Sequence, residues 1–397
     1  MSVAYIVDPV CSQFLGHNYT ALHLFQKYLE DMKLFKSVKC VASEVLPEAS
    51  EGDDIDRLFH YCYSVFMPLA HLTEDYEKEW VSQQSQKVSS DPLVEQSYKD
   101  WATFFKKYKV KSTDAIVMPS IDYCSTMGLL HFMKRDLTTK TCPAIKLRFI
   151  GVLENASKYS ADPKADIFQL LRELSDDFPI AISTETPLYS SFVAENIGRP
   201  AYVVPYPVFE KDPLPMPESD AFGISSLGSA RMDKGFGELP GIMQRMHAKY
   251  PDFNFRFEGQ LPPGNVSVDP NLLNSLYCLP RVRMLPESIT DAEMRDLWLR
   301  TDVALLPYSA GTYRYRGSAI LQEALNYGRL VLTGPNTAFA DQIRYYNCGY
   351  VVNSHEEYVD MLYRLAQTDR QKRRDQALQA RFLFQIDSQT SYEKWMS

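Results

Sequence analysis

The stretch VALLPYSAGTYRYRGSAILQEALNYGRLVLTG, residues 303–334, decides the fold. It begins with a short apolar run, Val303–Pro307, and ends with a second run, Arg329–Leu332. Between them lie a loop of small and polar residues and an amphipathic segment that starts at Gly317. Strand, helix and strand in this order are typical of a parallel sheet covered by helices.

The same alternation of short apolar runs and amphipathic segments continues along most of the 397 residues. A chain of this length is too long to fold around one ordinary hydrophobic core, so we expect two domains. The fold class predicted is α/β, with two doubly wound, Rossmann-like domains that face each other across a cleft. In the second half, the other strands are expected at Phe222–Ser226, Phe253–Phe257, Val282–Leu285 and Gly349–Val352.

The domain boundary is expected in YPVFEKDPLPMPESD, residues 206–220, where four prolines disfavour helices and sheet ladders alike. The first domain then carries inserted helices between its strands. The predicted organisation is a first domain (1–212), a linker (213–220), a second domain (221–375) and a terminal helix (376–397).

Composition excludes several classes of protein. A net charge of −8 argues against general nucleic-acid binding, which depends on a basic surface. The seven scattered cysteines form no CxxC pair and are interpreted as reduced, structural thiols. The first residues, MSVAYIVDPV, lack the features of a signal peptide, and no run of about 18 apolar residues occurs, so a cytoplasmic location is expected.

The first chemical signal is the segment LGSARMDKGFGELPGIM, residues 227–243. Three glycines, Gly228, Gly235 and Gly237, bracket Arg231 and Lys234 just before a predicted helix. Small residues let a phosphate approach the backbone, arginine offers a bidentate fork and lysine a point charge. The spacing suits a diphosphate, although a solvated turn with an ordinary basic pair would have the same residues.

The second signal lies in residues 303–334 themselves. Arg316 precedes a helix start at Gly317, Ser318 and Ala319, whose free N–H groups suit phosphate oxygens. Glu323 follows in an apolar stretch, and its carboxylate has the chemistry to accept both hydroxyls of a ribose. A surface salt bridge is the alternative, but a carboxylate among apolar neighbours requires a partner.

Together these segments resemble the retaining glycosyltransferases of the two-domain B-type fold, a family 4-like group that builds bacterial saccharides and glycolipids. The resemblance rests on an ordered series: GSARMDKG, FRFEG, RVRMLPESITDAEMRDLWLRTDVALLPY, GSAILQEALNYGRLVLTG and NCGYVV. It implies that Arg231 and Lys234 hold a donor diphosphate and that Glu323 holds the ribose. It also implies a terminal helix that crosses back to the first domain, using packing residues around Trp395.

The resemblance further implies a loop after the first strand that touches the donor phosphate, here Gly16 with His17 and Asn18 beside it. Asn18 is alternatively a helix cap. The family commonly has a second glutamate at the position of Tyr315, so Tyr315 and Arg316 are candidates for the sugar contact. Where the family often has a histidine, the segment IKLRFIGVLEN offers Glu154 as a contact to the donor sugar or acceptor.

The function expected is transfer of a hexose from a UDP- or GDP-sugar to a hydroxyl acceptor, with retention, as in polysaccharide biosynthesis. The acceptor would be a saccharide, a lipid-linked saccharide or a protein. No cofactor and no metal are expected, because Asp54-x-Asp56 lies in an acidic loop and Arg231 and Lys234 supply positive charge. Two alternatives stay open: a nucleotide-sugar epimerase, and a catalytically silent nucleotide-sugar-binding or scaffold subunit.

Membrane contact is a separate question. The segment WATFFKKYKVK, residues 101–111, mixes aromatic residues with four lysines and suits an anionic membrane surface. An ordinary amphipathic crossover helix is the interpretation we favour. Peripheral contact at the inner face of a membrane therefore remains a secondary expectation.

Overall fold

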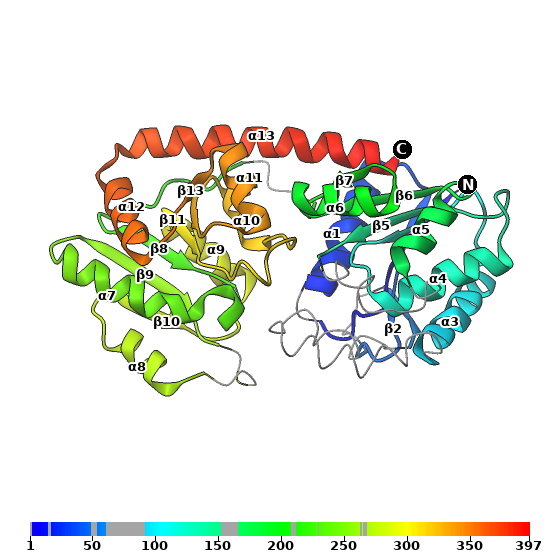
Figure 1. Ribbon diagram of the computed structural model, residues 1–397, viewed down its shortest axis with the longest axis horizontal. Helices are drawn as coiled ribbons and strands as arrows, with labels where there is room; N and C mark the ends of the chain where they lie inside the picture. The colour runs from blue at the N-terminus through cyan, green and yellow to red at the C-terminus, as the bar shows by residue number, and fades with distance from the viewer. Residues whose placement is uncertain are drawn as a thin grey trace. The chain divides into compact units, whose positions relative to one another are not determined.

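The computed structural model describes residues 2–14, 17–48, 54–60, 92–151, 166–207, 212–228, 230–262, 264 and 268–397. The chain forms two compact units. The first comprises Met1–Pro207 with Thr390–Ser397, and the second comprises Val208–Gln389 (Figure 1). Each unit has its own parallel sheet, so the predicted α/β class with two doubly wound domains is confirmed.

The first unit contains a seven-stranded parallel sheet of order β3-β2-β1-β4-β5-β6-β7. Its strands are β1 (Val3–Asp8), β2 (Ser37–Ser43), β3 (Ile55–Phe59), β4 (Ala115–Met118), β5 (Ala144–Phe149), β6 (Ile180–Thr184) and β7 (Ala201–Val203). Its helices are α1 (His17–Met32), α3 (Pro92–Tyr108), α4 (Tyr123–Asp136), α5 (Ile167–Ser175) and α6 (Pro187–Ile197). The strand order reverses between β1 and β4, the place where ligands of doubly wound sheets bind.

Helix α3 contains most of the aromatic, lysine-rich segment, residues 101–111. Trp101 and Phe104 are fully buried, and the Trp101 indole donates a hydrogen bond to the Ser125 carbonyl at 2.9 Å. Asp56, from the acidic Asp54-x-Asp56 segment, lies in β3 and accepts a hydrogen bond from the Tyr108 hydroxyl at 2.6 Å. The aromatic face of this segment therefore belongs to the core of the first unit.

The second unit contains a six-stranded parallel sheet of order β10-β9-β8-β11-β12-β13. Its strands are β8 (Phe222–Ser226), β9 (Phe255–Gln260), β10 (Val282–Leu285), β11 (Val303–Leu306), β12 (Leu330–Thr333) and β13 (Gly349–Val351). Its helices are α7 (Leu239–Lys249), α8 (Pro270–Tyr277), α9 (Asp291–Arg300), α10 (Ala319–Tyr327), α11 (Ala338–Tyr346), α12 (His355–Gln367) and most of α13 (Arg370–Met396).

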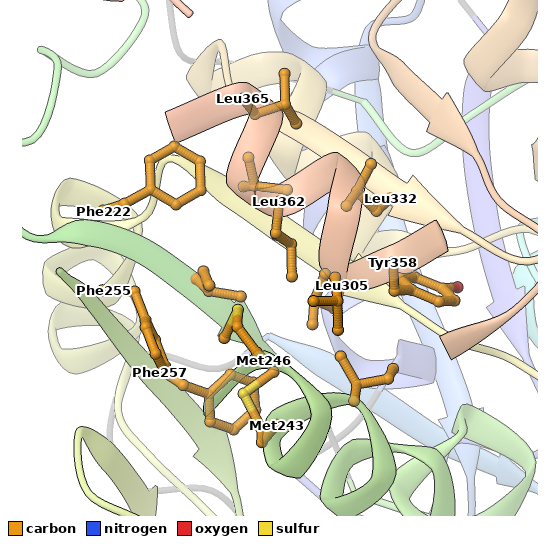
Figure 2. Packing of buried hydrophobic residues seen from close by; sticks show 14 of the residues in the cluster. Phe222, Met243, Met246, Phe255, Phe257, Leu305, Leu332, Tyr358, Leu362 and Leu365 are labelled. Carbon is orange, nitrogen blue, oxygen red and sulfur yellow. The ribbon is translucent and has the colours of Figure 1, made fainter. Parts of the chain in front are cut away.

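Successive residues of β11 pack alternately into two hydrophobic clusters, one on each face of the sheet, which explains the unbroken apolar sequence of this strand. Val303 and Leu305 belong to the cluster formed with α7 and α12, whereas Ala304 and Leu306 belong to the cluster formed with α9, α10 and α11. Figure 2 shows the first of these clusters, where aromatic side chains of β8 and β9 meet methionines of α7 and leucines of α12. Burial on both faces fixes the strand at the centre of the sheet.

The break between the units, after Pro207, falls within the stretch 206–220 in which the boundary was expected, whereas the finer limits differ. Residues 213–220 form no free linker: Leu214 is buried in the second unit, and Arg329 donates a hydrogen bond to the Pro215 carbonyl at 2.6 Å. The terminal helix begins at Arg370, so the expected limit at 375 falls inside it. Only Thr390–Ser397 of this helix group with the first unit.

The last turns of α13 complete a hydrophobic cluster of the first unit. Trp395 is fully buried against Phe25, with the ring centroids 6.0 Å apart, and its indole donates to the Ala181 carbonyl at 3.3 Å. Tyr392 is also buried and donates to the Pro205 carbonyl. These contacts explain why a mostly charged helix ends in aromatic residues.

We expect Trp395→Ala to lower the free energy of unfolding of the first unit by about 3–5 kcal/mol, because a large buried side chain is replaced by a cavity. Urea unfolding, followed by tryptophan fluorescence and circular dichroism, measures this. Phe382→Ala on the same helix is the control, since Phe382 is 63% exposed and its removal should change stability by less than about 0.5 kcal/mol. Equal losses in the two variants would contradict the packing described.

Candidate functional site

The candidate site lies at the carboxyl edge of the second sheet. Strand order reverses there between β8 and β11, which pair in parallel, so this is the switch point of the second unit. The chain leaves β8, passes Gly228 with φ at +85°, and forms a short 3₁₀ turn, Met232–Lys234. Gly235 ends that turn with φ at +73°.

Gly235 fixes the position of this turn. A Cβ atom at Gly235 would lie 1.9 Å from the carbonyl oxygen of Pro307, so only glycine permits the approach. The Ser309 N–H donates to the Asp233 carbonyl at 2.9 Å and reinforces the same contact. The turn that carries Arg231 and Lys234 is therefore attached to the segment that follows β11.

Arg231 is held by two partners that the sequence did not reveal. Its Nε and Nη2 atoms donate to the two carboxylate oxygens of Asp233, each at 2.9 Å. Its Nη2 also donates to the hydroxyl of Tyr313 at 3.2 Å. The Arg231 side chain is 33% exposed, so a ligand in the site can reach it.

Lys234 is partly buried beside the same groups. Its Nζ lies 6.0 Å from the centroid of the Tyr308 ring, and no residue of the described chain forms a hydrogen bond or ion pair with this side-chain ammonium group. Burial, followed by the positive charge of Arg231, lowers the pKa of Lys234 to about 8. The carboxylates of Asp233 and Glu323 oppose this shift. An anion bound here would favour the charged lysine.

The predicted helix start lies next to Lys234. Gly228 lies beside both predicted segments: a Cβ atom added there would lie 3.4 Å from Lys234 Nζ and 3.3 Å from the Ile320 side chain. Helix α10 begins at Ala319, and the Ser318 hydroxyl caps it by accepting from the Leu321 N–H at 3.3 Å. The first N–H groups of such a helix attract anions.

Glu323 has the partner that its apolar surroundings required. The indole Nε1 of the fully buried Trp298, on α9, donates to Glu323 Oε2 at 2.8 Å. This hydrogen bond orients the carboxylate. The negative charge of Glu323 raises the pKa of Lys234, so the two groups share one electrostatic environment. Trp298 was not predicted because it lies 25 residues earlier, on a different helix.

Tyr315 and Arg316 lie in the loop between β11 and α10, with Gly317 directly after them. The guanidinium of Arg314 lies over the Tyr315 ring at 5.3 Å. The positive charges of Arg231 and Arg316 moderate the pKa of the buried Tyr313, which burial and Asp233 nevertheless raise to about 12. The sugar-contacting roles of Tyr315 and Arg316 stay predictions.

The candidate residues of the first unit are less fully described. Gly16 and Glu154 lie outside the described residues, and His17 begins α1. Asn18 is not the helix cap considered above: it lies inside α1, and its Nδ2 donates to both carboxylate oxygens of Asp8, at 3.2 and 3.0 Å. Asp8 ends β1 and is fully buried. Burial raises its pKa to about 7.

Asp8 was missed although a signal for it exists. An aspartate that closes an apolar strand, as in VAYIVD, lies at the carboxyl edge of the sheet, where polar residues commonly serve ligands. Asp122, which caps α4, adds to the raised pKa of Asp8. These carboxylates form the polar centre of the first sheet's switch point.

In the described ranges, no group of three or more His, Cys, Asp or Glu side chains is arranged to hold a metal ion. The same part of the chain contains no helix with the length and apolar character needed to cross a bilayer. Its six described cysteines are not joined by disulfides.

Comparison with known proteins identifies the fold. No family model and no curated protein sequence matches the chain. Among solved structures, sucrose-phosphate synthase from Thermosynechococcus elongatus matches with a TM-score of 0.62 at 11% identity, over 100% of this chain and 96% of that one. A trehalose-6-phosphate synthase matches with a TM-score of 0.62 at 12% identity, over 98% and 96%.

An E. coli trehalose-6-phosphate structure bound with UDP-2-fluoro glucose matches with a TM-score of 0.63 at 12% identity, over 98% of this chain and 97% of that one. These likenesses confirm the predicted two-domain, B-type fold over the whole chain. The family 4-like label stays a prediction.

We expect Gly235→Ala to destabilise the second unit by at least about 1–3 kcal/mol, since alanine is strained at this φ and its Cβ meets the Pro307 carbonyl. Thermal unfolding measures the loss. Gly311→Ala is the matched control in the adjoining loop, where the atom nearest to an added Cβ is Ser309 Oγ at 3.8 Å. Wild-type stability of Gly235→Ala would show that the close approach is absent in solution.

Proposed function

We propose that this protein is a glycosyltransferase that moves a hexose from a UDP- or GDP-sugar to a hydroxyl acceptor, with retention at the anomeric carbon. One observation carries the proposal. Two cationic side chains, Arg231 and Lys234, a capped helix N-terminus at Ser318 and an oriented carboxylate, Glu323, gather at the switch point of the second sheet. This is the set of groups that a nucleoside diphosphate requires.

The diphosphate is the leaving group in such a reaction, and the site is suited to stabilise it. As the bond between the anomeric carbon and the phosphate oxygen breaks, negative charge grows on that oxygen. Arg231 contributes hydrogen bonds of fixed direction, and Lys234 contributes a partly desolvated charge whose effect on an anion is stronger than in water. Neither group needs a metal ion to act in this way.

The nucleoside would be held by Glu323, which follows the start of α10. Glu323 accepts from the Trp298 indole through Oε2, and a carboxylate so oriented can accept from ribose hydroxyls. The leaving phosphate would take the proton of the acceptor hydroxyl on the same face of the sugar as the new bond forms. No step requires a cofactor.

The solved structures support this proposal in the words of their own descriptions. One holds UDP-2-fluoro glucose, and another concerns glycosyl transfer with retention by trehalose-6-phosphate synthase. For this chain we propose a UDP- or GDP-hexose donor and a saccharide, lipid-linked or protein acceptor with a free hydroxyl. Peripheral contact with a membrane carrying the acceptor, at its cytoplasmic face, remains part of the proposal.

We expect Arg231→Ala and Lys234→Ala each to lower turnover by a factor of about 100 to 1,000, because each removes charge from the leaving phosphate. Release of UDP or GDP from a panel of nucleotide sugars, with and without acceptors, measures turnover. Arg245→Ala, an exposed arginine on α7, is the control and should be unaffected. Near wild-type rates in both site variants would refute the assignment.

Donor binding should depend on pH through Lys234. A lysine is charged below its pKa and neutral above it, so affinity for UDP or GDP is expected to hold near pH 7 and to fall as the pH rises through about 8. Isothermal titration calorimetry between pH 7 and 9.5 tests this. Lys234→Arg keeps its charge throughout, so its affinity should show no decrease near pH 8; a decrease of the same size there would exclude Lys234 as its source.

A further inference from the structure

We propose that Asp233 is a positioning residue that holds the Arg231 guanidinium in the orientation needed by the donor diphosphate. This inference rests on the proposed function, because it concerns the same nucleoside diphosphate site. Asp233 is an acidic side chain at a place where an anion is expected to bind, and its negative charge by itself would repel that anion.

The geometry favours positioning over simple charge balance. Both carboxylate oxygens of Asp233 accept from Arg231, from Nε at 2.9 Å and from Nη2 at 2.9 Å. Tyr313 accepts a further bond from Nη2 at 3.2 Å. Within the described residues, Nη1 is the guanidinium nitrogen that no protein group engages. Nη1 is therefore available to a ligand, while the bonds from Nε and Nη2 to Asp233 fix the plane of the guanidinium group.

Asp233 is itself rigidly held. Its side chain is only 15% exposed, and its carbonyl accepts from the Ser309 N–H at 2.9 Å. The Lys234 and Phe236 N–H groups both donate to the Arg231 carbonyl, at 3.0 and 3.2 Å. Arg231 thus has little freedom before a ligand arrives, so binding need not freeze a long side chain.

The Asp233 charge has a second effect, on Lys234. The charged groups that act on Lys234 are Arg231 and Asp233 from the turn and Glu323 from α10, while the segment after β11 contributes the Tyr308 ring. Asp233 raises the pKa of Lys234, against burial and Arg231. Removal of the Asp233 charge would therefore make Lys234 lose its proton at a lower pH.

The test is calorimetric titration of Asp233→Asn with UDP and GDP from pH 6.5 to 9.5. We expect affinity near pH 7 to fall about tenfold, equivalent to the loss of one good charge-assisted contact, and the decrease in affinity to move to lower pH. Tyr313→Phe loses only the bond to Nη2, so it should weaken binding less and leave the pH of the decrease unchanged. Asp252→Asn, an exposed acid on the same unit, should match the wild type.

A second measurement needs no ligand. The rate of acetylation of Lys234, followed by mass spectrometry against pH, reports its titration in the folded protein, and circular dichroism confirms that each variant is folded. An unchanged Lys234 titration and unchanged affinity in Asp233→Asn would overturn the role. Tighter binding would also overturn it, by showing that Asp233 competes with the diphosphate. If the wild type binds neither UDP nor GDP, the proposed function fails together with this role.

Discussion

The contact on which the site depends is the approach of Gly235 to the carbonyl of Pro307. Two segments separated by some 70 residues meet there without a side chain between them, and their meeting brings the cations of one segment to the helix start of the other. Parallel sheets make this possible, because strands β8 and β11 end at the same edge. The positive φ of Gly235 and the missing Cβ are both needed, so backbone geometry precedes the electrostatics of the site.

Within that frame, charges of opposite sign alternate at short range. Arg231 is hydrogen-bonded to Asp233, and the Lys234 ammonium group lies in the field of Asp233 and Glu323 while no described residue forms a hydrogen bond with that group. Such a balance keeps two cations near each other in a partly buried region at a tolerable desolvation cost. A doubly charged phosphate group would then complete the set rather than enter an empty positive pocket. The proposed chemistry follows from this arrangement.

Sequence reasoning located most strands because central strands of parallel sheets are apolar on both faces; Phe222–Ser226 matches β8 at both ends. The cations and helix start were also predictable, since glycines and a Ser cap have local signatures. The partners were not: Tyr313 lies 82 residues from Arg231, and Trp298 lies 25 residues from Glu323. The packing of Leu214 and Pro215 was unpredictable for a similar reason, because it depends on distant residues.

The last turns of α13 have a consequence for biosynthesis. The first unit needs Tyr392 and Trp395 to fill its cluster, and Tyr392 bonds to Pro205 across 187 residues of sequence. A ribosome makes the strands of the first unit long before these two aromatic residues emerge. Part of the apolar surface of the first unit therefore stays exposed during synthesis, and this unit completes its folding only after the second unit has been synthesised.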